Sequence, residues 1–393
     1  MTALSELIAR ADARAAQRLH SVADARRAAR RRLPTVVFDY VDGAADDEVT
    51  MRRNEEAFTA VEFRPKMASG MTEPRLATSV LGRSIELPVL LAPCGLVRLL
   101  HPDGAAGVAR AADTRGTVSV LSTVAGTAVE AVAGEASTPL WFQLYAAGGL
   151  PEADTLCERA AGAGAEALVV TVDTPVLGNR ERDVRHGVAP PLRVDAHNVV
   201  PLGAQVLARP RWAVQLGATG IRLSRRGAGP SGHGSGMLSA VASPFSWDDV
   251  AHLRTRWRGP LVVKGILSGD DARRAVDCGA DALVVSNHGG RQLDGAPATL
   301  RALPGVVSAV GGHAEVLVDG GIRRGSHVVA ALCLGARAVM IGRPYLYGLA
   351  AAGELGVERI LDILGAEMRR TMVLMGCTSV DELGQEWLEI PAG

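Results

Sequence analysis

From Pro88 onward, short apolar runs alternate along the chain with alanine-rich segments of helical period. Unbroken apolar runs are typical of strands buried on both faces, so the alternation predicts parallel βα units rather than hairpins. We identify eight such runs, at Pro88–Pro93, Val118–Ser122, Leu140–Tyr145, Ala167–Asp173, Leu261–Gly265, Ala282–Gly290, Val316–Gly321 and Ala338–Arg343. Eight parallel strands with intervening helices predict a closed (β/α)8 barrel, the TIM barrel, rather than an open sheet.

The chain ahead of the first run has a different character. Thr2–Arg32 is rich in alanine and arginine and predicts one or two helices that stop before Pro34, and Thr35–Phe58 predicts further helix. We therefore expect residues 1–60 to form an N-terminal helical cap on a barrel of residues 61–393, the two making one integrated domain.

Two later segments also depart from the βα repeat. Gly187–Pro244, between the fourth and fifth runs, is too long for an ordinary connection, and its glycine, proline and serine content predicts a long, mobile and partly disordered loop. Gly353–Met375, after the last run, has the period of an amphipathic helix.

Composition narrows the class of protein. The chain has 393 residues, 48% of them hydrophobic, which is enough for one large core, and its formal net charge is +0. No global positive field would attract nucleic acid or anionic lipid. The 5 cysteines are scattered without the spacing of a disulfide framework or a metal site. Without a signal peptide or a long apolar span, a cytoplasmic protein that does not insert stably into membranes is expected.

Polar residues gather where the predicted strands end. The active sites of TIM barrels form at the carboxyl ends of the strands, so these residues would share one mouth. They are Cys94, Ser122, Gln143, Tyr145, Thr171, Asp173, Lys264, Ser286, His288, Arg291, Asp319, Arg323 and Arg343. The convergence of a base, carboxylates, a lysine and several arginines exceeds what structural roles require, so we expect an active site there.

Two of these strand ends have the composition of a phosphate site. The segment GGIRRG, with Gly320, Gly321 and Arg323, follows the seventh run, and IGR, with Gly342 and Arg343, follows the eighth. Glycines let backbone N–H groups approach phosphate oxygens, and arginine adds a forked donor. A turn glycine would explain either segment alone. Together they predict a bound phosphate group.

His288 lies in SNHGGRQLD, just past a strand end. Histidine has an unperturbed pKa of about 6.5, which suits a general base, and Asp173 is the candidate carboxylate that would stabilise its protonated form. Lys264 ends a buried strand, so it pairs with a core carboxylate or stabilises an anionic ligand ring. Arg180 is either a surface charge or a substrate contact.

These segments carry a family resemblance. WFQLY, TVDTPVLGNRERD, VKGI, SNHGGRQLDG, VDGGIRRG and IGRP occur in order on the predicted strands. With them, the chain resembles the FMN-dependent α-hydroxy acid oxidases and dehydrogenases, such as glycolate oxidase, mandelate dehydrogenase and cytochrome-type lactate dehydrogenase, from about Leu33 to Gly384.

The resemblance implies that FMN oxidises a small-molecule 2-hydroxy acid to the 2-oxo acid, with flavin N5 receiving the electrons. It makes His288 the proton acceptor, Asp173 its partner, Arg180 and Arg291 the clamp on the substrate carboxylate, and Tyr145 a contact of the substrate hydroxyl. Expected FMN contacts are Pro93, Cys94, Gly95, Ser122, Gln143, Thr171, Lys264 and Ser286, with the phosphate at Asp319, Gly320, Gly321, Arg323, Gly342 and Arg343. By analogy the protein is a homo-oligomer, commonly a tetramer in this family.

Three departures from the family pattern bear on substrate and acceptor. Phe38 stands where many members have a tyrosine that binds the substrate carboxylate, so one anchor is expected to be missing. Val124 replaces the tryptophan of glycolate oxidase, which implies a wider pocket and an aryl or longer-chain acid. Gly95 is usually alanine in the oxidases and glycine in several acceptor-linked dehydrogenases. A dehydrogenase is therefore favoured, and the acceptor can be oxygen, a quinone or a carrier protein.

Other interpretations of the same residues stay open. The stretch Gly335–Leu364 and the ending Asp381–Gly393 also resemble the branch of the family that modifies peptide-derived amines in redox-cofactor biosynthesis. A redox-neutral FMN isomerase would use the same glycines and lysine, but would not need the histidine and arginine of SNHGGRQLD. A non-enzymatic flavin-binding barrel would leave the polar mouth without a purpose.

Overall fold

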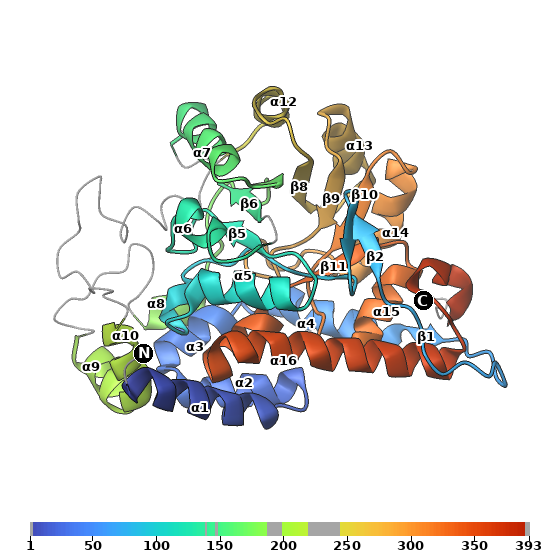
Figure 1. Cartoon of the computed structure of the whole chain (residues 1–393). Coiled ribbons are helices and arrows are strands. Elements are labelled where there is room, and N and C mark those ends of the chain that lie inside the picture. Colours follow the sequence, from blue (N-terminus) through green and yellow to red (C-terminus); the bar gives the residue numbers. More distant parts are fainter. Residues whose placement is uncertain (1–2, 138–139, 146–147, 187–198, 219–243, 390–393) are drawn as a thin grey trace.

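The computed structural model describes residues 3–137, 140–145, 148–186, 199–218 and 244–389. Its centre is an 8-stranded parallel sheet in the order β4-β11-β10-β9-β8-β7-β6-β5 (Figure 1). The strands are β4 (Val89–Leu91), β5 (Val120–Ser122), β6 (Trp141–Leu144), β7 (Ala167–Thr171), β8 (Leu261–Ile266), β9 (Ala282–Val285), β10 (Glu315–Val318) and β11 (Ala338–Ile341). The Leu91 amide of β4 donates to the carbonyl of Val118, just before β5, at 2.9 Å. This contact joins the two ends of the strand order. The predicted TIM barrel is confirmed.

Helices follow the strands and cover the outside of the barrel. They are α5 (Gly104–Thr114), α6 (Val129–Ala133), α7 (Leu150–Gly162), α8 (Glu181–Arg185), α12 (Trp247–Arg256), α13 (Gly269–Asp277), α14 (Thr299–Val310), α15 (Gly325–Cys333) and α16 (Arg343–Met375). Short 3-10 helices lie at η1 (Ala57–Ala60), η2 (Val97–Leu99), η3 (Val380–Glu382) and η4 (Gln385–Trp387). The amphipathic helix expected at the end of the barrel forms the second part of α16, which is kinked at Ala352 and Gly353.

The apolar strands divide their side chains between two cores. Leu90, Val169 and Val284 point into the barrel and pack in its interior, whereas neighbours such as Leu91 and Val170 pack outward against the helices. Side chains alternate along a strand, so a run that is apolar throughout fills both spaces at once.

A small hairpin lies across the amino-terminal end of the barrel. It consists of β2 (Thr78–Val80) and β3 (Arg83–Ile85), and its apolar residues Val80 and Ile85 join the interior core. The Leu81 amide donates to a carboxylate oxygen of Glu315, at the start of β10, at 3.0 Å. This hairpin does not cover the opposite end, where the strands finish and where the active site of a TIM barrel is expected.

The N-terminal segment is helical, as expected. It forms α1 (Ala3–Gln17), α2 (Val22–Arg32), α3 (Thr35–Asp42) and α4 (Val49–Glu56). Helices α1 and α2 lie along α16 (Figure 1). The turn after α3 reaches the mouth of the barrel, where the Ala45 amide donates to the Gly290 carbonyl at 2.8 Å. A short pairing of β1 (Glu62–Phe63) with β12 (Leu388–Glu389) ties the segment after the cap to the C-terminal part of the chain.

Part of the expected long loop is helical. Residues 199–218 form α9 (Val199–Leu207) and α10 (Pro210–Ala218), which corrects the prediction of loop for this stretch. The indole N–H of Trp212 donates to the Leu99 carbonyl at 2.7 Å, and burial of this side chain holds α10 against the barrel. The rest of the predicted loop lies outside the described residues. Among the helices that the structure describes, none has the length and apolarity to cross a membrane.

A buried charge cluster joins the cap to the barrel. Asp12, on α1, is 5% exposed and accepts from Arg32 at 2.9 Å and from His101 at 3.2 Å. Burial raises the pKa of Asp12, but its bonds with His101 and Arg32 outweigh that effect and lower it overall. The carboxylate is therefore charged in the folded state and balances a buried guanidinium.

We predict that Asp12→Asn lowers the free energy of unfolding by about 3 kcal/mol, because it leaves the buried charge of Arg32 uncompensated. The denaturant midpoint of the purified holoenzyme measures this. An unchanged midpoint would mean that the cluster contributes nothing to the docking of the cap.

Candidate active site

His288 and Asp173 form a close pair at the ends of β9 and β7. The Nδ1 atom of His288 lies 3.0 Å from an Asp173 carboxylate oxygen, and its Nε2 lies 3.4 Å from the Tyr145 hydroxyl. His288 has φ of 58°, in the left-handed region, which is uncommon for non-glycine residues and is found in turns and at functional sites. Burial raises the pKa of Asp173, but the charges of His288 and Lys264 outweigh burial and hold it below its usual value. An ionised Asp173 therefore orients the imidazole through this contact.

Two arginines face the same cavity with little negative charge near them. The guanidinium groups of Arg180 and Arg291 lie 5.9 and 5.1 Å from the centre of the Tyr40 ring. Arg291 donates to backbone carbonyls, and the carboxylate paired with Arg180, that of Asp183, is 3.9 Å away. Burial lowers the pKa of Arg180, and the positive charge of Arg291 lowers it further. Such a pair of guanidiniums favours a bound carboxylate.

Tyr40, rather than Phe38, belongs to this cavity. Phe38 packs against Tyr347, with ring centres 6.4 Å apart, and faces a different hollow beside α2. Side chains that are two residues apart on a helix point in directions about 200° apart. Only one of these rings can therefore face the barrel mouth. A tyrosine hydroxyl is thus present at the site, which corrects the expectation that this anchor is missing. The apolar neighbours Val37 and Val41, buried with Phe38, are the signal in the sequence that could have placed it in the core.

Lys264 has the partner that an ion pair in the core requires, and it also lines the cavity. Its ammonium lies 2.9 Å from Asp319 and 2.7 Å from the Ser286 hydroxyl, which in turn donates to Asp319 at 2.8 Å. Burial lowers the pKa of Lys264, but Asp319 and Asp173 outweigh burial and raise it. The carboxylate of Asp319 is engaged by Lys264 and Ser286 and also lines the cavity, so its place among the cofactor contacts stays a prediction.

Two buried polar atoms without partners lie near the carboxyl ends of β6 and β7, although their residues are not among those that line the cavity. The side-chain nitrogen of Gln143 and the hydroxyl of Thr171 are buried and have no hydrogen-bond partner among the described residues. An unsatisfied buried polar group costs about 1–3 kcal/mol. Ser122 donates to Gln143 at 2.6 Å and fixes the amide. A flavin ring, with donors and acceptors along one edge, would satisfy both atoms, so these residues fit FMN.

The walls and the far end of the cavity hold most of the remaining predicted cofactor residues. Pro93, Cys94, Gly95 and Val124 line one wall, and Gly320, Gly321, Arg323, Gly342 and Arg343 line the far end. The guanidinium of Arg343 is buried among backbone carbonyls, and burial lowers its pKa to about 10. Arg323 is paired with Glu55 at 2.8 Å. A buried cation held by neutral carbonyls at the start of α16 suits a phosphate group.

Gly321 is required for packing as well as for phosphate binding. Its φ is 77°, and a Cβ there would lie 2.1 Å from the Asn54 carbonyl at the end of α4. Asn54 and Asn287 exchange side-chain hydrogen bonds of 2.8 and 2.9 Å and hold α4 to the loop that carries His288. The sequence analysis missed these contacts, because they join segments far apart in the chain.

The lining of this cavity joins His288 and the two arginines to the glycine segments after β10 and β11. A TIM barrel whose mouth holds a His–Asp pair, two arginines and these glycine segments fits a flavin-dependent oxidoreductase. A family model described as FMN-dependent dehydrogenase matches residues 29–390. The chain belongs to this family of α-hydroxy acid enzymes, and its cofactor is FMN.

Known relatives agree with this assignment. A pre-mycofactocin synthase of Mycolicibacterium smegmatis is 41% identical over 384 residues, which cover 95% of this chain and 94% of that protein. An L-lactate dehydrogenase of Stenotrophomonas maltophilia is 41% identical over 373 residues, covering 93% and 97%. The crystal structure of (S)-mandelate dehydrogenase, described as a monotopic membrane protein, superposes with a TM-score of 0.88 at 36% identity and covers 95% of this chain and 100% of its own.

We predict that Thr171→Val weakens FMN binding about tenfold without destabilising the apoprotein. The substitution removes a buried hydroxyl that has no hydrogen-bond partner among the described residues, so only the complex would lose a hydrogen bond. Flavin fluorescence during dilution of the holoenzyme gives the dissociation constant, and denaturation of the apoprotein gives its stability. Unchanged affinity together with a less stable apoprotein would place the role of this hydroxyl in the fold.

Proposed function

We propose that this protein oxidises a 2-hydroxy acid with an aryl or longer apolar substituent to the corresponding 2-oxo acid. One observation carries the proposal. His288, a base paired with the ionised carboxylate of Asp173, faces the same cavity as Arg180 and Arg291. The charges of these two arginines are poorly balanced by nearby carboxylates. A proton acceptor beside a carboxylate clamp matches a substrate that carries an oxidisable carbon next to a carboxylate.

The chain's own residues bind, orient and deprotonate this substrate. Arg180 and Arg291 hold the carboxylate by charge-assisted hydrogen bonds, and the Tyr40 hydroxyl adds a donor. Tyr145, 3.4 Å from His288, contacts the substrate hydroxyl. His288 accepts a proton at Nε2, while its Nδ1 stays bonded to Asp173. FMN supplies the acceptor for the two electrons that leave the substrate carbon.

An apolar wall supports a substituent larger than a methyl group. Val124 and Tyr145 are buried together, with Leu177 packed against them, and the first two line the cavity. An aryl or branched alkyl group would bury apolar surface here, at roughly 25 cal/mol per Å². We expect the affinity to rise with the size of this group until the wall is filled.

Gly95 bears on the electron acceptor less directly than the family pattern suggests. A Cβ at this position would lie 3.0 Å from a methyl carbon of Val124 and 3.1 Å from the Tyr40 hydroxyl. A side chain here would require Val124 and Tyr40 to shift by a few tenths of an ångström, whichever acceptor is used. An acceptor other than oxygen, a cytoplasmic location and a homo-oligomeric state stay predictions from the sequence.

A second candidate is oxidation of a peptide-derived amine. The similarity to a pre-mycofactocin synthase along 95% of this chain favours it. The poorly balanced charges of Arg180 and Arg291 favour the hydroxy acid instead, because an amine without a carboxylate would leave both arginines unpaired in the complex.

We predict that mandelate or another bulky 2-hydroxy acid bleaches the flavin of the holoenzyme under anaerobic conditions, and that Asp173→Asn slows the bleaching by about 100-fold or more. An amide cannot balance the charge that His288 gains as it accepts the proton, and the full loss of general base catalysis typically costs 10²–10⁴-fold. Stopped-flow absorbance of both proteins measures the rate. If every acid fails while an amine-bearing peptide bleaches the flavin, the second candidate replaces the first. If neither reacts, a redox-neutral isomerase becomes the better explanation.

We predict that Val124→Trp shifts the preference from bulky to small acids. The indole would fill the space against Tyr145 and Leu177, so kcat/KM for mandelate should fall by about tenfold or more relative to that for glycolate or lactate. Steady-state kinetics with the three acids tests this, and Val124→Ile is the control that fills less of the pocket. An unchanged ratio in Val124→Trp would show that the substituent binds elsewhere.

A further inference from the structure

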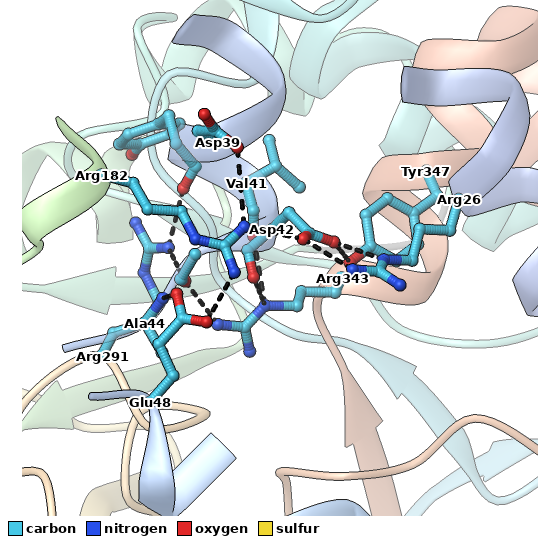
Figure 2. Close-up of polar contacts among 12 residues, drawn as sticks. Arg26, Asp39, Val41, Asp42, Ala44, Glu48, Arg182, Arg291, Arg343 and Tyr347 are labelled. Carbon is cyan, nitrogen blue, oxygen red and sulfur yellow. Dashed lines mark hydrogen bonds and ion pairs between the residues drawn. The ribbon is translucent and has the colours of Figure 1, made fainter. Parts of the chain in front are cut away.

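The last turn of α3 holds two functional arginines through its backbone. One nitrogen of Arg291 donates to the Tyr40 and Gly43 carbonyls at 2.7 and 3.0 Å. Arg343 donates to the carbonyls of Val41, Asp42 and Gly43 at 3.2, 3.2 and 2.7 Å (Figure 2). The final carbonyls of a helix have no partner within it and carry its negative end. One turn thus orients an arginine of the substrate clamp and an arginine of the phosphate end.

The side chain of Asp42 fixes this turn. Asp42 is 2% exposed and does not line the cavity. One carboxylate oxygen accepts from Arg26 at 2.6 Å and from the Tyr347 hydroxyl at 2.7 Å. The other accepts from Arg26 at 2.8 Å and from Arg182 at 3.1 Å (Figure 2). Four hydrogen bonds from α2, α8 and α16 therefore converge on one buried carboxylate.

Two of these donors lie next to functional residues along the chain. Arg182 is two residues after Arg180 and lies in α8, the helix that Arg180 caps. Tyr347 is one helical turn after Arg343 in α16. Asp42 itself is two residues after Tyr40. One carboxylate therefore connects the segment of the substrate clamp with the segment of the phosphate end.

The charges around the turn explain why a carboxylate is needed there. Arg26, Arg182, Arg291 and Arg343 surround the turn, and Arg182 also pairs with Glu48 at 2.5 Å. Burial raises the pKa of Asp42, but its bonds with Arg26 and Tyr347 outweigh burial and bring it to about 2. A neutral amide at this position would leave Arg26 without the carboxylate that it pairs with, whereas Arg182 would keep Glu48 and Asp39.

We propose that Asp42 is a positioning residue that sets the substrate clamp and the FMN phosphate end together. It acts through Arg182 on the loop of Arg180, and through Tyr347 and the turn of α3 on Arg343. The part of this inference that concerns FMN rests on the cofactor that family membership shows. The part that concerns the substrate rests on the proposed function.

The test is Asp42→Asn in the full-length holoenzyme. We expect the FMN dissociation constant and the KM for the best hydroxy acid each to rise about tenfold, while kcat falls less than about threefold. Tenfold corresponds to about 1.4 kcal/mol. The two arms can be separated, because Arg182→Gln should raise only KM and Tyr347→Phe only the FMN dissociation constant.

Asp12→Asn is the matched control, since it neutralises another buried, arginine-paired carboxylate of the cap that lies outside this network. It should lower stability and leave KM and the FMN dissociation constant of the folded enzyme unchanged. If Asp42→Asn changes stability alone, as this control does, the proposal is overturned. If Asp42→Asn does not fold, Arg26→Gln, at a side chain that is 54% exposed, should shift both constants in the same direction. Unchanged constants in that variant would also overturn the proposal.

The two proposals fail in distinguishable ways. FMN affinity is measured without any substrate, so an unchanged FMN dissociation constant in Asp42→Asn counts against the positioning role even if no hydroxy acid reacts. A wild-type enzyme that binds FMN but is reduced by no hydroxy acid would instead count against the proposed function alone.

Discussion

The structure depends above all on holding several guanidinium groups at one end of a barrel with few carboxylates in contact with them. Arg180, Arg291 and Arg343 face the cavity, and the last two are held by neutral backbone carbonyls instead of by acids. A buried cation without a counterion is costly unless an anion completes its environment. The protein therefore maintains a site that favours the binding of anionic groups.

This constraint makes the helical cap a part of the active site. Tyr40 comes from α3, the carbonyls that orient Arg291 and Arg343 come from the turn after it, and Asn54 at the end of α4 holds the loop of His288. The barrel supplies Lys264 from β8, and Asp173 and His288 from the segments just after β7 and β9. The chemistry is assembled where these two parts meet, and a separate barrel or a separate cap would hold an incomplete set.

The predicted glycines show how packing and binding share one position. Gly321 lies at the phosphate end of the cavity, yet its missing Cβ faces the backbone of α4, 2.1 Å from a carbonyl. Gly95 borders the cavity, but the space that it leaves is occupied by Val124 and the Tyr40 hydroxyl. In both cases the glycine brings the cap or the pocket wall close enough to form the site.

The sequence by itself determined the barrel, the strand ends and the identity of most of the chemistry. Apolar runs buried on both faces have few alternatives to parallel strands, and the residues that follow such strands must share one mouth. His288, Arg291 and the two glycine segments could therefore be placed at this mouth, and the FMN cofactor followed from the family resemblance that these segments carry. Tertiary structure alone decided that Tyr40 rather than Phe38 reaches the cavity, that Asp319 pairs with Lys264, and that Asp42 gathers donors from three helices. The physical reason is that local pattern specifies which elements form, whereas the rotation of a short helix about its axis and the pairing of distant charges are set by packing between elements far apart in the chain.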